Sequence, residues 1–140
     1  AGTGAAFERA DGAGMCAAVA DYTPESVSET KLKKGDGELF IRLRRTRDIA
    51  AELGRRKGER ILVGFALETD HEEAHAQSKL EKKNFDFIVL NSLRDVGAGF
   101  RGDTNKVTFI DRTGDEALPL LSKQEVAEHI ADRIERLFAR

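Results

Sequence analysis

The stretch RILVGFALETDHEEAHAQSKLEKKNFDFIVLN, residues 60–91, decides the fold of this chain. It opens and closes on short apolar runs, RILVGFAL and FDFIVLN, which are typical of strands that are buried on both faces. Between them, Thr69 and Glu72 stand in the spacing of a capping box, which predicts a helix that ends near Lys83. Strand, helix and strand in this order predict two parallel strands joined by a crossover helix.

Three further elements are predicted before this stretch. Residues 13–19, AGMCAAV, indicate a short buried strand whose small side chains leave space above it. Residues 38–44, ELFIRLR, alternate between apolar and polar side chains, which is typical of a strand with one face in water. Thr46 stands where an N-cap would begin a helix over residues 47–56, and Gly58 follows the end of that helix.

A hairpin and a closing helix are predicted after the stretch. KVTFI, residues 106–110, and ALPLL, residues 117–121, flank the turn DRTGDE. Ser122 and Glu125 form a second capping box. The apolar side chains of the helix that follows recur on one face, at Val126, Ile130, Ile134 and Leu137. The whole pattern predicts one α/β domain over residues 1–140, with a Rossmann-like, mostly parallel sheet, crossover helices and an added strand pair.

Composition indicates a globular protein in a reducing compartment, the cytoplasm. Of the 140 residues, 40% are apolar and 34% are charged, and no apolar run approaches the roughly 18 residues that a membrane-spanning helix needs. We therefore expect no membrane segment. The first residues lack the pattern of a secretory signal, and Cys16 has no partner for a disulfide within the chain. Inside an apolar strand, Cys16 is interpreted as a small core residue rather than a nucleophile.

Charge is unevenly distributed along the chain. The formal net charge of −2 argues against general nucleic-acid binding. Residues 31–60, however, hold eleven of the 23 basic side chains against five acidic ones, so this window carries +6 and the remainder −8. Such a window is either an anion site or a set of solvated cations. Position favours solvated cations for four of the arginines, Arg42, Arg44, Arg55 and Arg56.

Two short motifs match known chemistry in letters but lack its structural context. GAGFRG, residues 97–102, spells a dinucleotide fingerprint, but a loop precedes it and the strand KVTFI follows, so no helix begins there to meet a pyrophosphate. A loop that covers a ligand is the preferred interpretation. HEEAH, His71–His75, has the spacing of a zinc motif, but it opens a strongly charged helix, and only His129 or a carboxylate remains as a third ligand. A zinc hydrolase is therefore the weaker hypothesis, and no metal ligand is assigned.

The predicted parallel strands end on residues that suit a ligand site, namely Ala20–Asp21, Ala66–Thr69 and Asn91. In open α/β sheets, ligands gather at the carboxyl ends of the strands. The block KLKK, which begins at Lys31, follows Asp21 by ten residues on a loop. Lysines on a loop can close over an anion at this edge, so we expect an anion site there.

Six sequence blocks resemble, in order, the C-terminal part of the phosphopantothenate–cysteine ligase family. They are CAAVADY with KLKK, TRDIAAELG, LVGFALET, KLEKKNFDFIVLN, GAGFRGDTNKVTFI and LPLLSKQEVAEHIADRI. The resemblance begins near Phe7 and covers nearly all of the chain that follows. It implies a Rossmann-like sheet with an additional dimerising strand portion, a homodimer, and an enzyme of coenzyme A biosynthesis. It also implies a decarboxylase domain, fused or separate, as a partner.

The resemblance further implies a reaction and a set of site residues. In that family the carboxylate of 4′-phosphopantothenate attacks CTP to give an acyl-cytidylate and pyrophosphate, and the amine of cysteine then displaces CMP to form an amide. CTP is thus the implied co-substrate, accompanied by Mg²⁺, and Lys31 is the implied catalytic lysine. The implied nucleotide-binding residues are Met15, Cys16, Ala17, Asp21, Lys31, Arg47, Asp48, Ile49, Ala50, Phe65, Lys79 and Lys83. Further candidates are Lys33, Lys34 and Asn91.

Elementary chemistry agrees with these implied roles. A carboxylate and a triphosphate repel each other, so lysines and free helix N–H groups have to neutralise the developing charge. Lys79 and Lys83 lie four apart on one predicted helical face and would reach one anion. Phe65 would pack either against a base or in the core, and the sequence leaves both interpretations open. Asp21 suits ribose hydroxyls, a cytosine amine or a metal-bound water.

The chain departs from the family pattern in two places. Arg47 stands where the family usually has proline. The glycine-rich phosphate loop and the asparagine-containing segment that open the family's domain are not matched, because AGTGAAFERADG is too short to hold them. We therefore expect a domain that is truncated at its amino end. The alternative hypothesis is a non-catalytic fragment that binds the nucleotide or dimerises.

Overall fold

A computed structural model describes residues 2–32, 37–68, 72–92 and 103–139 of the chain. It divides into two compact units. Unit 1 comprises Ala1–Cys16 together with Ile49–Arg140, and unit 2 comprises Ala17–Asp48. The single domain expected over residues 1–140 stays a prediction.

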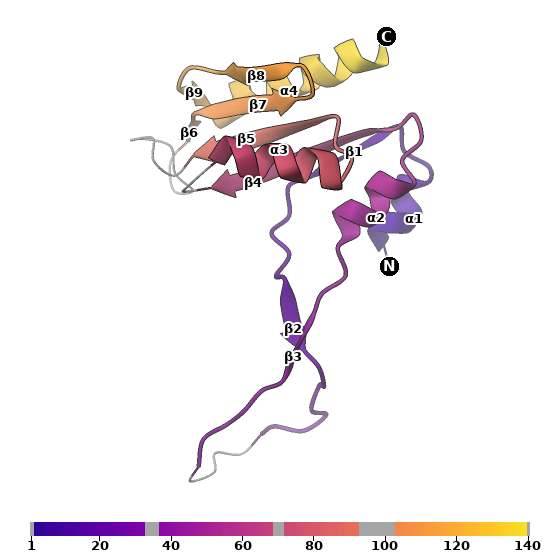
Figure 1. The fold of residues 1–140 in the computed structure, drawn as a ribbon, viewed down its shortest axis with the longest axis vertical. Helices are drawn as coiled ribbons and strands as arrows, with labels where there is room; N and C mark the ends of the chain where they lie inside the picture. Colours follow the sequence, from indigo (N-terminus) through magenta and orange to yellow (C-terminus); the bar gives the residue numbers. More distant parts are fainter. Residues whose placement is uncertain (1, 33–36, 69–71, 93–102, 140) are drawn as a thin grey trace. The chain divides into compact units, whose positions relative to one another are not determined.

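Unit 1 is built on a five-stranded sheet (Figure 1). In spatial order its strands are β1 (Gly12–Met15), β4 (Ile61–Glu68), β5 (Phe87–Ser92), β7 (Val107–Asp111) and β8 (Gly114–Ala117). β1, β4 and β5 run parallel to one another, and β7 and β8 continue the sheet in antiparallel pairing. The predicted fold class, a mostly parallel α/β sheet with crossover helices and an added strand pair, is confirmed.

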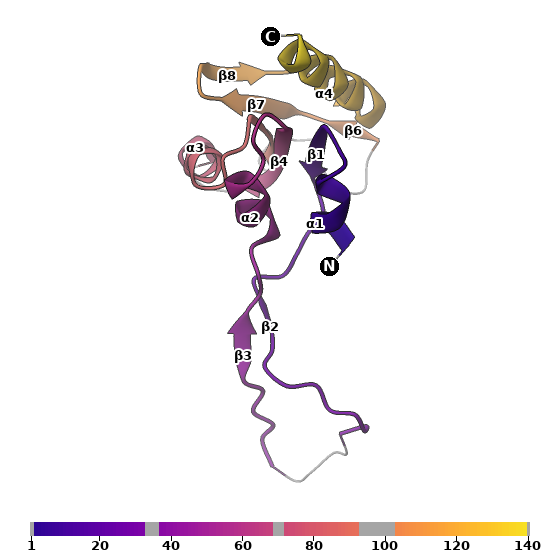
Figure 2. The same ribbon diagram turned by 90° about the vertical axis from the view of Figure 1, so that its right-hand side faces the viewer.

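Helices cover both faces of this sheet. They are α1 (Gly2–Phe7), α2 (Ile49–Arg55), α3 (Glu72–Lys82) and α4 (Lys123–Phe138). Figures 1 and 2 show α3 on one side of the sheet and α4 on the other. A short pair of strands, β6 (Thr104–Asn105) and β9 (Leu121–Ser122), directly precedes α4. None of the helices in the described ranges is both long and apolar enough to cross a membrane.

β4 and β5 are apolar along their length because both of their faces are buried. Leu62 belongs to the cluster that contains Leu80 of α3. The next residue, Val63, points to the opposite face and belongs to the cluster that contains Val126 of α4. Burial of a side chain of this size contributes about 2 kcal/mol. The apolar positions expected on the inner face of α4 all pack in the second cluster, namely Val126, Ile130, Ile134 and Leu137.

The start of α4 and the end of α3 follow local signals in the sequence. The capping box at α4 is confirmed, since the Glu125 N–H donates to Ser122 Oγ over 3.2 Å and the Ser122 N–H donates to Glu125 Oε2 over 2.8 Å. α3 ends at Lys82, close to the expected residue, and Asn84 with φ 52° turns the chain out of the helix. The capping residue expected for α3, Thr69, lies outside the described residues.

The first predicted strand is shorter than expected. β1 ends at Met15, and both Cys16 and Val19 are exposed, so the prediction of a buried Cys16 is wrong. Residues 16–18 carry small side chains, which bury too little apolar area to keep this segment in the sheet.

Thr46 does not cap a helix, which corrects a second prediction. α2 begins at Ile49, two residues later than expected. The Thr46 hydroxyl instead donates a hydrogen bond of 2.6 Å to the carbonyl oxygen of Ala20. The hydroxyl that was expected to cap a helix is therefore bonded to a residue 26 positions earlier in the sequence.

Unit 2 contains a two-stranded ribbon in place of the predicted half-buried strand. β2 (Tyr22–Pro24) pairs antiparallel with β3 (Leu43–Arg45). Only the end of the strand expected over residues 38–44 is a strand, and its apolar side chains are exposed. The prediction of one buried face is therefore wrong, since Leu39, Ile41 and Leu43 are all exposed.

The predicted hairpin is confirmed, with its second strand shifted toward the turn. β7 and β8 pair as far as Asp111 and Gly114, so part of DRTGDE is strand and the loop consists of Arg112 and Thr113. Asp111 Oδ1 closes this turn by accepting hydrogen bonds from the Thr113 N–H, over 2.7 Å, and from the Thr113 hydroxyl, over 2.6 Å. The carboxylate cap makes the two-residue loop possible where the sequence suggested a longer one.

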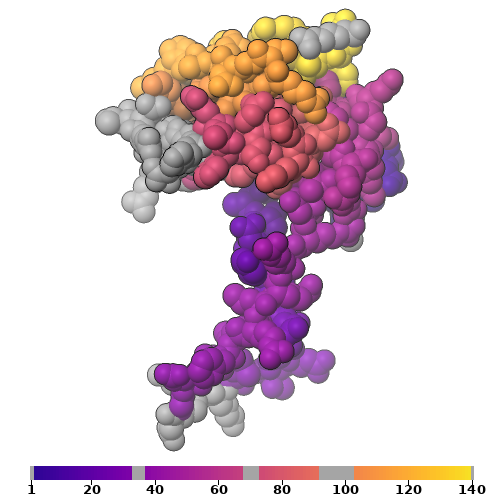
Figure 3. All heavy atoms as spheres, viewed as in Figure 1, coloured from indigo at the N-terminus to yellow at the C-terminus, as the bar shows by residue number. Residues whose placement is uncertain are grey.

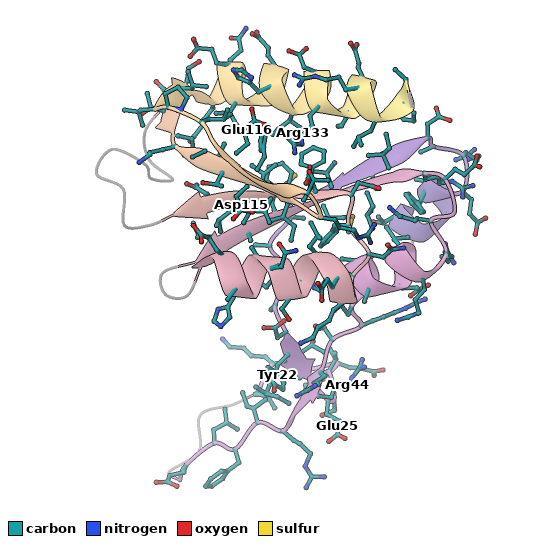
Figure 4. All side chains as sticks on the ribbon, turned by 45° about the horizontal axis from the view of Figure 1, so that its top comes forward. Tyr22, Glu25, Arg44, Asp115, Glu116 and Arg133 are labelled. Atoms are coloured by element: carbon teal, nitrogen blue, oxygen red, sulfur yellow. The ribbon has the colours of Figure 1, made fainter. Side chains whose placement is uncertain are left out.

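Arg133 fastens α4 to the added strand pair. Its guanidinium donates hydrogen bonds to Asp111 and, over 2.6 Å, to Glu116 Oε2, and Figure 4 shows it directed toward Glu116. It also lies 5.4 and 5.3 Å from the ring centroids of Phe87 and Phe109. Partial burial alone would raise the pKa of Asp111, but the hydrogen bonds from Thr113 and Arg133 outweigh burial and hold that pKa below its ordinary value.

Replacing Arg133 by glutamine should destabilise unit 1. The substitution removes the charged donor from Asp111 and Glu116 and leaves Asp111 beside an uncharged amide. We expect the free energy of unfolding at pH 7, measured by urea denaturation, to fall by about 2–3 kcal/mol. Arg136→Gln, on an exposed position of the same helix, is the matched control and should change it by less than about 0.5 kcal/mol.

The same substitution should lose its effect in acid. Because the folded-state pKa of Asp111 is lowered, the stability from its pairing is present above the unfolded-state pKa and is lost as the pH falls through the folded-state pKa. The difference between Arg133→Gln and the unsubstituted protein should therefore shrink below about pH 4. An equal difference at pH 7 and pH 3 would contradict this account of Asp111.

Candidate functional site

The parallel strands of unit 1 place several predicted site residues at one edge of the sheet. β1 ends on Met15, β4 on Glu68 and β5 on Ser92, and the arrowheads of β4 and β5 point the same way in Figure 1. Phe65 and Asn91 lie in the last halves of β4 and β5. The carboxyl edge, where ligands gather in such sheets, thus carries Phe65 and Asn91, whereas the strand end expected at Ala20–Asp21 lies beyond β1, in unit 2.

Met15 and Phe65 point to opposite faces at this edge. Met15 pairs with Gly64 and packs against the cluster under α2 and α3. Phe65, one residue after Gly64, is on the α4 face, and 43% of its surface is exposed. The interpretation of Phe65 as a core residue is therefore excluded, and its ring remains available to a ligand.

Glycine in β1 is what leaves the Phe65 ring open. Gly14 is on the α4 face of β1, since it pairs with Val63. A Cβ atom at Gly14 would lie 4.0 Å from Cε2 of Phe65, in van der Waals contact with the ring. With glycine there, the edge of the ring next to β1 is uncovered. The small residues noted in this strand therefore create the space above it.

Asn91 carries an unsatisfied acceptor at the same edge. Its Nδ2 lies 3.5 Å from Oδ1 of Asn105, which is in β6. Its own Oδ1 is buried and has no hydrogen-bond partner within the part of the chain that the structure describes. A buried acceptor without a partner costs about 1–3 kcal/mol. A ligand that donates a hydrogen bond at this point would recover that energy.

Asn105 is a site residue that the sequence analysis did not single out. Asn105 directly precedes KVTFI, residues 106–110, whose apolar pattern predicts a strand but no site. The available signal was a short polar pair, Thr104 and Asn105, placed directly before a buried strand. The side chains of Asn91 and Asn105 form a polar pair although they are 14 residues apart in the sequence.

The first turn of α2 contributes backbone rather than side chains. Ile49 and Ala50 pack against the core cluster that contains Leu53. Their side chains are therefore occupied, and the groups they can offer a ligand are main-chain N–H donors of a helix start. The nucleotide contact that the resemblance implies at Ile49 and Ala50 stays a prediction, and it would have to use their main-chain N–H groups.

Lys79 and Lys83 belong to a different region of unit 1. They lie in the last turn of α3 and just after it, and the Lys83 N–H donates to the Lys79 carbonyl over 3.0 Å. Since α3 runs from the end of β4 to the start of β5, this turn is at the amino ends of the strands. Unit 1 therefore does not bring these lysines to the edge that carries Phe65 and Asn91, and their shared anion stays a prediction.

Five other predicted site residues belong to unit 2 and are exposed, namely Ala17, Asp21, Lys31, Arg47 and Asp48. The ribbon of β2 and β3 links two of the segments that carry them. The Thr46 N–H donates to the Asp21 carbonyl over 2.9 Å, next to Arg47. Lys33 and Lys34 lie outside the described residues, as do GAGFRG at 97–102 and His71. Within the described ranges no group of three or more His, Cys, Asp or Glu side chains could hold a metal ion.

Comparison with known proteins gives consistent matches along the chain. The family model described as "DNA/pantothenate metabolism flavoprotein C-terminal domain" matches residues 2–138. A cysteine/cysteine sulfinic acid decarboxylase from an unknown prokaryotic organism is 53% identical over 131 residues, which are 92% of this chain and 36% of that protein. The coenzyme A biosynthesis bifunctional protein CoaBC of Bacillus subtilis is 48% identical over 122 residues, 86% of this chain and 30% of that protein.

A solved structure is also similar to this chain. The crystal structure of the C-terminal domain of CoaBC has a TM-score of 0.74 and 37% sequence identity, and the match covers 95% of this chain and 57% of that one. The chain thus spans about a third of the length of the two curated relatives and somewhat more than half of the solved domain.

Phe65→Ala should separate ligand binding from stability. Because Phe65 is partly exposed, we expect a loss of about 1 kcal/mol or less in unfolding free energy, but about a tenfold loss in affinity for CTP if the ring carries a base. Phe85→Ala is the contrast, since its buried ring should cost about 3–5 kcal/mol in stability. Urea denaturation and calorimetric titration with CTP measure the two quantities. CTP affinity unchanged by Phe65→Ala would remove this residue from the site.

Proposed function

The chain belongs to the DNA/pantothenate metabolism flavoprotein C-terminal domain family, and from this premise we propose that it acts in the phosphopantothenate–cysteine ligase reaction of coenzyme A biosynthesis. The observation that carries the proposal is the match over residues 2–138, together with 48% identity to a protein named for coenzyme A biosynthesis. The resemblance of six ordered blocks to the ligase family supports the specific reaction.

The proposed reaction has two steps. A carboxylate oxygen of 4′-phosphopantothenate attacks the α-phosphorus of CTP, and pyrophosphate leaves. The amine of cysteine then attacks the acyl carbon of the acyl-cytidylate, CMP leaves with the electron pair of the broken bond, and the amine loses a proton. Both steps join or separate anions, so positive charge near the phosphates lowers both barriers.

Residues of this chain fit the requirements of these steps. Lys31 is exposed in unit 2, and we propose that its ammonium neutralises charge on the phosphates and assists the second step. Within unit 1, the exposed ring of Phe65 suits a base. Within unit 2, Asp21 is of the type that suits ribose hydroxyls or a base amine. Mg²⁺ with a triphosphate needs few protein carboxylates, so Asp21 alone fits it, and the ion would supply further charge neutralisation.

Two wider features remain part of the proposal. A decarboxylase portion accompanies the ligase, which the name of the relative with 53% identity and the word "bifunctional" in the other relative's name support. A cytoplasmic location is supported by the single cysteine of the sequence.

The second candidate function competes with the ligase. It is a non-catalytic role for this chain, in nucleotide binding or dimerisation, and the exposed apolar side chains of the ribbon favour it.

The exposed apolar face of the ribbon supports a homodimer. Tyr22 pairs with Arg45 and Pro24 with Leu43, which puts these four residues on one face. Its two large apolar side chains, Tyr22 and Leu43, are 52% and 55% exposed, and Arg45 is the charged residue at its end. The opposite face is polar, with Arg44 and an ion pair of 3.7 Å between Arg42 and Glu25.

A ribbon of two strands is barely stable alone. The described part of unit 2, drawn as indigo to purple spheres in Figure 3, contains no helix that could cover the ribbon. We infer that the apolar face pairs with the same face of a second copy, because a patch of this kind marks an interface and a twofold contact is self-complementary.

Turnover of CTP tests the ligase proposal. We expect pyrophosphate release from CTP and 4′-phosphopantothenate, and amide formation once cysteine is added. Lys31→Gln should let the acyl-cytidylate accumulate and slow amide formation by about a hundredfold, the usual scale for loss of one charge-stabilising group. Lys82→Gln, an exposed lysine of α3, is the control and should keep full activity.

The same assay distinguishes the second candidate. If CTP raises the melting temperature but no pyrophosphate is released, the chain binds the nucleotide without turnover. Amide formation by Lys31→Gln at the unsubstituted rate would contradict the role of Lys31.

Leu43→Glu should break the proposed dimer, because it replaces the exposed apolar side chain opposite Pro24 with a charge that the interface would have to bury. Light scattering coupled to size-exclusion chromatography should show the mass of the unsubstituted protein falling to about half. Arg44→Gln, on the polar face of the same strand, should leave the mass unchanged. If Leu43→Glu keeps the mass of the unsubstituted protein, this face is not the interface.

A further inference from the structure

Thr46 joins the two ends of the ribbon in unit 2. Its hydroxyl donates to the Ala20 carbonyl over 2.6 Å, and its N–H donates to the Asp21 carbonyl over 2.9 Å. The ladder of β2 and β3 contains three residue pairs and ends at Tyr22 and Arg45. Thr46 therefore extends the pairing by one position and binds two successive carbonyl groups on the opposite segment.

Thr46 is one of two half-buried residues in the described part of unit 2. In the ranges 17–32 and 37–48, every residue is exposed except Thr23 and Thr46. Besides the ladder, the Glu25 N–H donates to the Arg42 carbonyl over 2.9 Å, Ser28 bonds to the Thr30 carbonyl, and Arg42 pairs with Glu25. At the end of the ribbon next to Tyr22 and Arg45, the two hydrogen bonds of Thr46 join the segments.

The segments that Thr46 joins are those that carry predicted nucleotide contacts. Ala17 and Asp21 precede β2, and Arg47 and Asp48 directly follow Thr46. A hydrogen bond to the carbonyl of Asp21 fixes the backbone at that residue and so the direction in which its carboxylate leaves the chain. The peptide bond to Arg47 fixes the start of the second segment in the same way.

We propose that Thr46 is a positioning residue for the nucleotide: it holds Asp21 and the segment that begins at Arg47 at the separation that binding requires. The inference rests on the proposed function, since it concerns the same site. Thr46 acts through these neighbours and makes no contact with the nucleotide itself. Its hydroxyl donates to the Ala20 carbonyl, and α2 begins only at Ile49, three residues later.

Thr46→Val isolates the hydroxyl. Valine has nearly the same shape and β-branching, keeps the N–H bond to Asp21, and replaces only the donor to Ala20. Thr46→Ser restores a hydroxyl that can reach the same carbonyl. Thr23→Val is the matched control, because Thr23 is the other half-buried threonine of unit 2 and pairs with Arg44 inside the ladder.

The expected result is a change in binding with little change in turnover. For Thr46→Val, the KM for CTP and its calorimetric dissociation constant should rise about threefold to tenfold, the factor that corresponds to one lost hydrogen bond. The kcat should stay within about twofold, because Lys31 is not held by Thr46. Thr46→Ser and Thr23→Val should both bind CTP within about twofold of the unsubstituted protein.

A double substitution tests whether Thr46 acts through Asp21. If it does, Asp21→Asn and Thr46→Val should weaken CTP binding together by less than the product of their separate factors, because the first substitution removes what the second misplaces. Effects that multiply fully would show that Thr46 acts elsewhere and would overturn the inference.

The remaining outcomes are also decisive. If the unsubstituted protein binds CTP and Thr46→Val binds it equally well, the positioning role is wrong and the proposed function stands. If Thr46→Val loses CTP binding only together with its dimer mass or its melting transition, and Thr46→Ser does not restore binding, the role is merely structural and the inference fails. If the unsubstituted protein binds no CTP, the proposed function fails and the inference fails with it.

Discussion

The parallel pairing of β4 with β5 is the constraint on which the rest of unit 1 depends. Asp86 begins this pairing: its N–H donates to the Leu62 carbonyl over 2.8 Å, and its Oδ2 accepts from the Leu62 N–H over 2.7 Å. The same oxygen accepts from the buried Lys57 ammonium over 2.6 Å, which ties in the segment after α2. With this register fixed, side chains alternate between the α3 and α4 faces, and the carboxyl ends of both strands reach one edge.

The sequence predicted the parts of this arrangement that depend on periodicity and local caps. The apolar runs around residues 60–91 could only be strands buried on both faces, and the capping box at Ser122 required no distant partner. One prediction failed because the partner is distant in sequence. Thr46 bonds to Ala20, 26 residues away, and no pattern within a single segment contains that partner. The turn after Asp111 is a local case, since the cap joins Asp111 to Thr113 within DRTGDE.

The candidate site also combines features that the sequence predicted with features that it did not. The first strand was expected to end at Ala20–Asp21, whereas β1 ends at Met15. Strand order predicted that Asn91 would lie at the shared carboxyl edge, and the resemblance implied Met15 and Phe65 as site residues. Neither predicted which face each side chain takes, so only the structure separates the packed Met15 from the open Phe65. Spacing likewise grouped Lys79 with Lys83 correctly, but the direction of α3 sets them at the other edge. One-dimensional spacing defines neighbours on an element, not the end of the sheet that they reach.

The ribbon of unit 2 serves both the proposed dimer and the proposed nucleotide site. Its apolar face carries Leu43, and the hydrogen bonds of Thr46 hold its end. Since two strands alone are barely stable, any surface that covers this face also strengthens the order at Thr46. Linkage then works in both directions: a nucleotide that needs the ordered ribbon favours the covered state, and covering favours the nucleotide by the same factor. The two proposals together imply that association and nucleotide binding are coupled through the ribbon's stability.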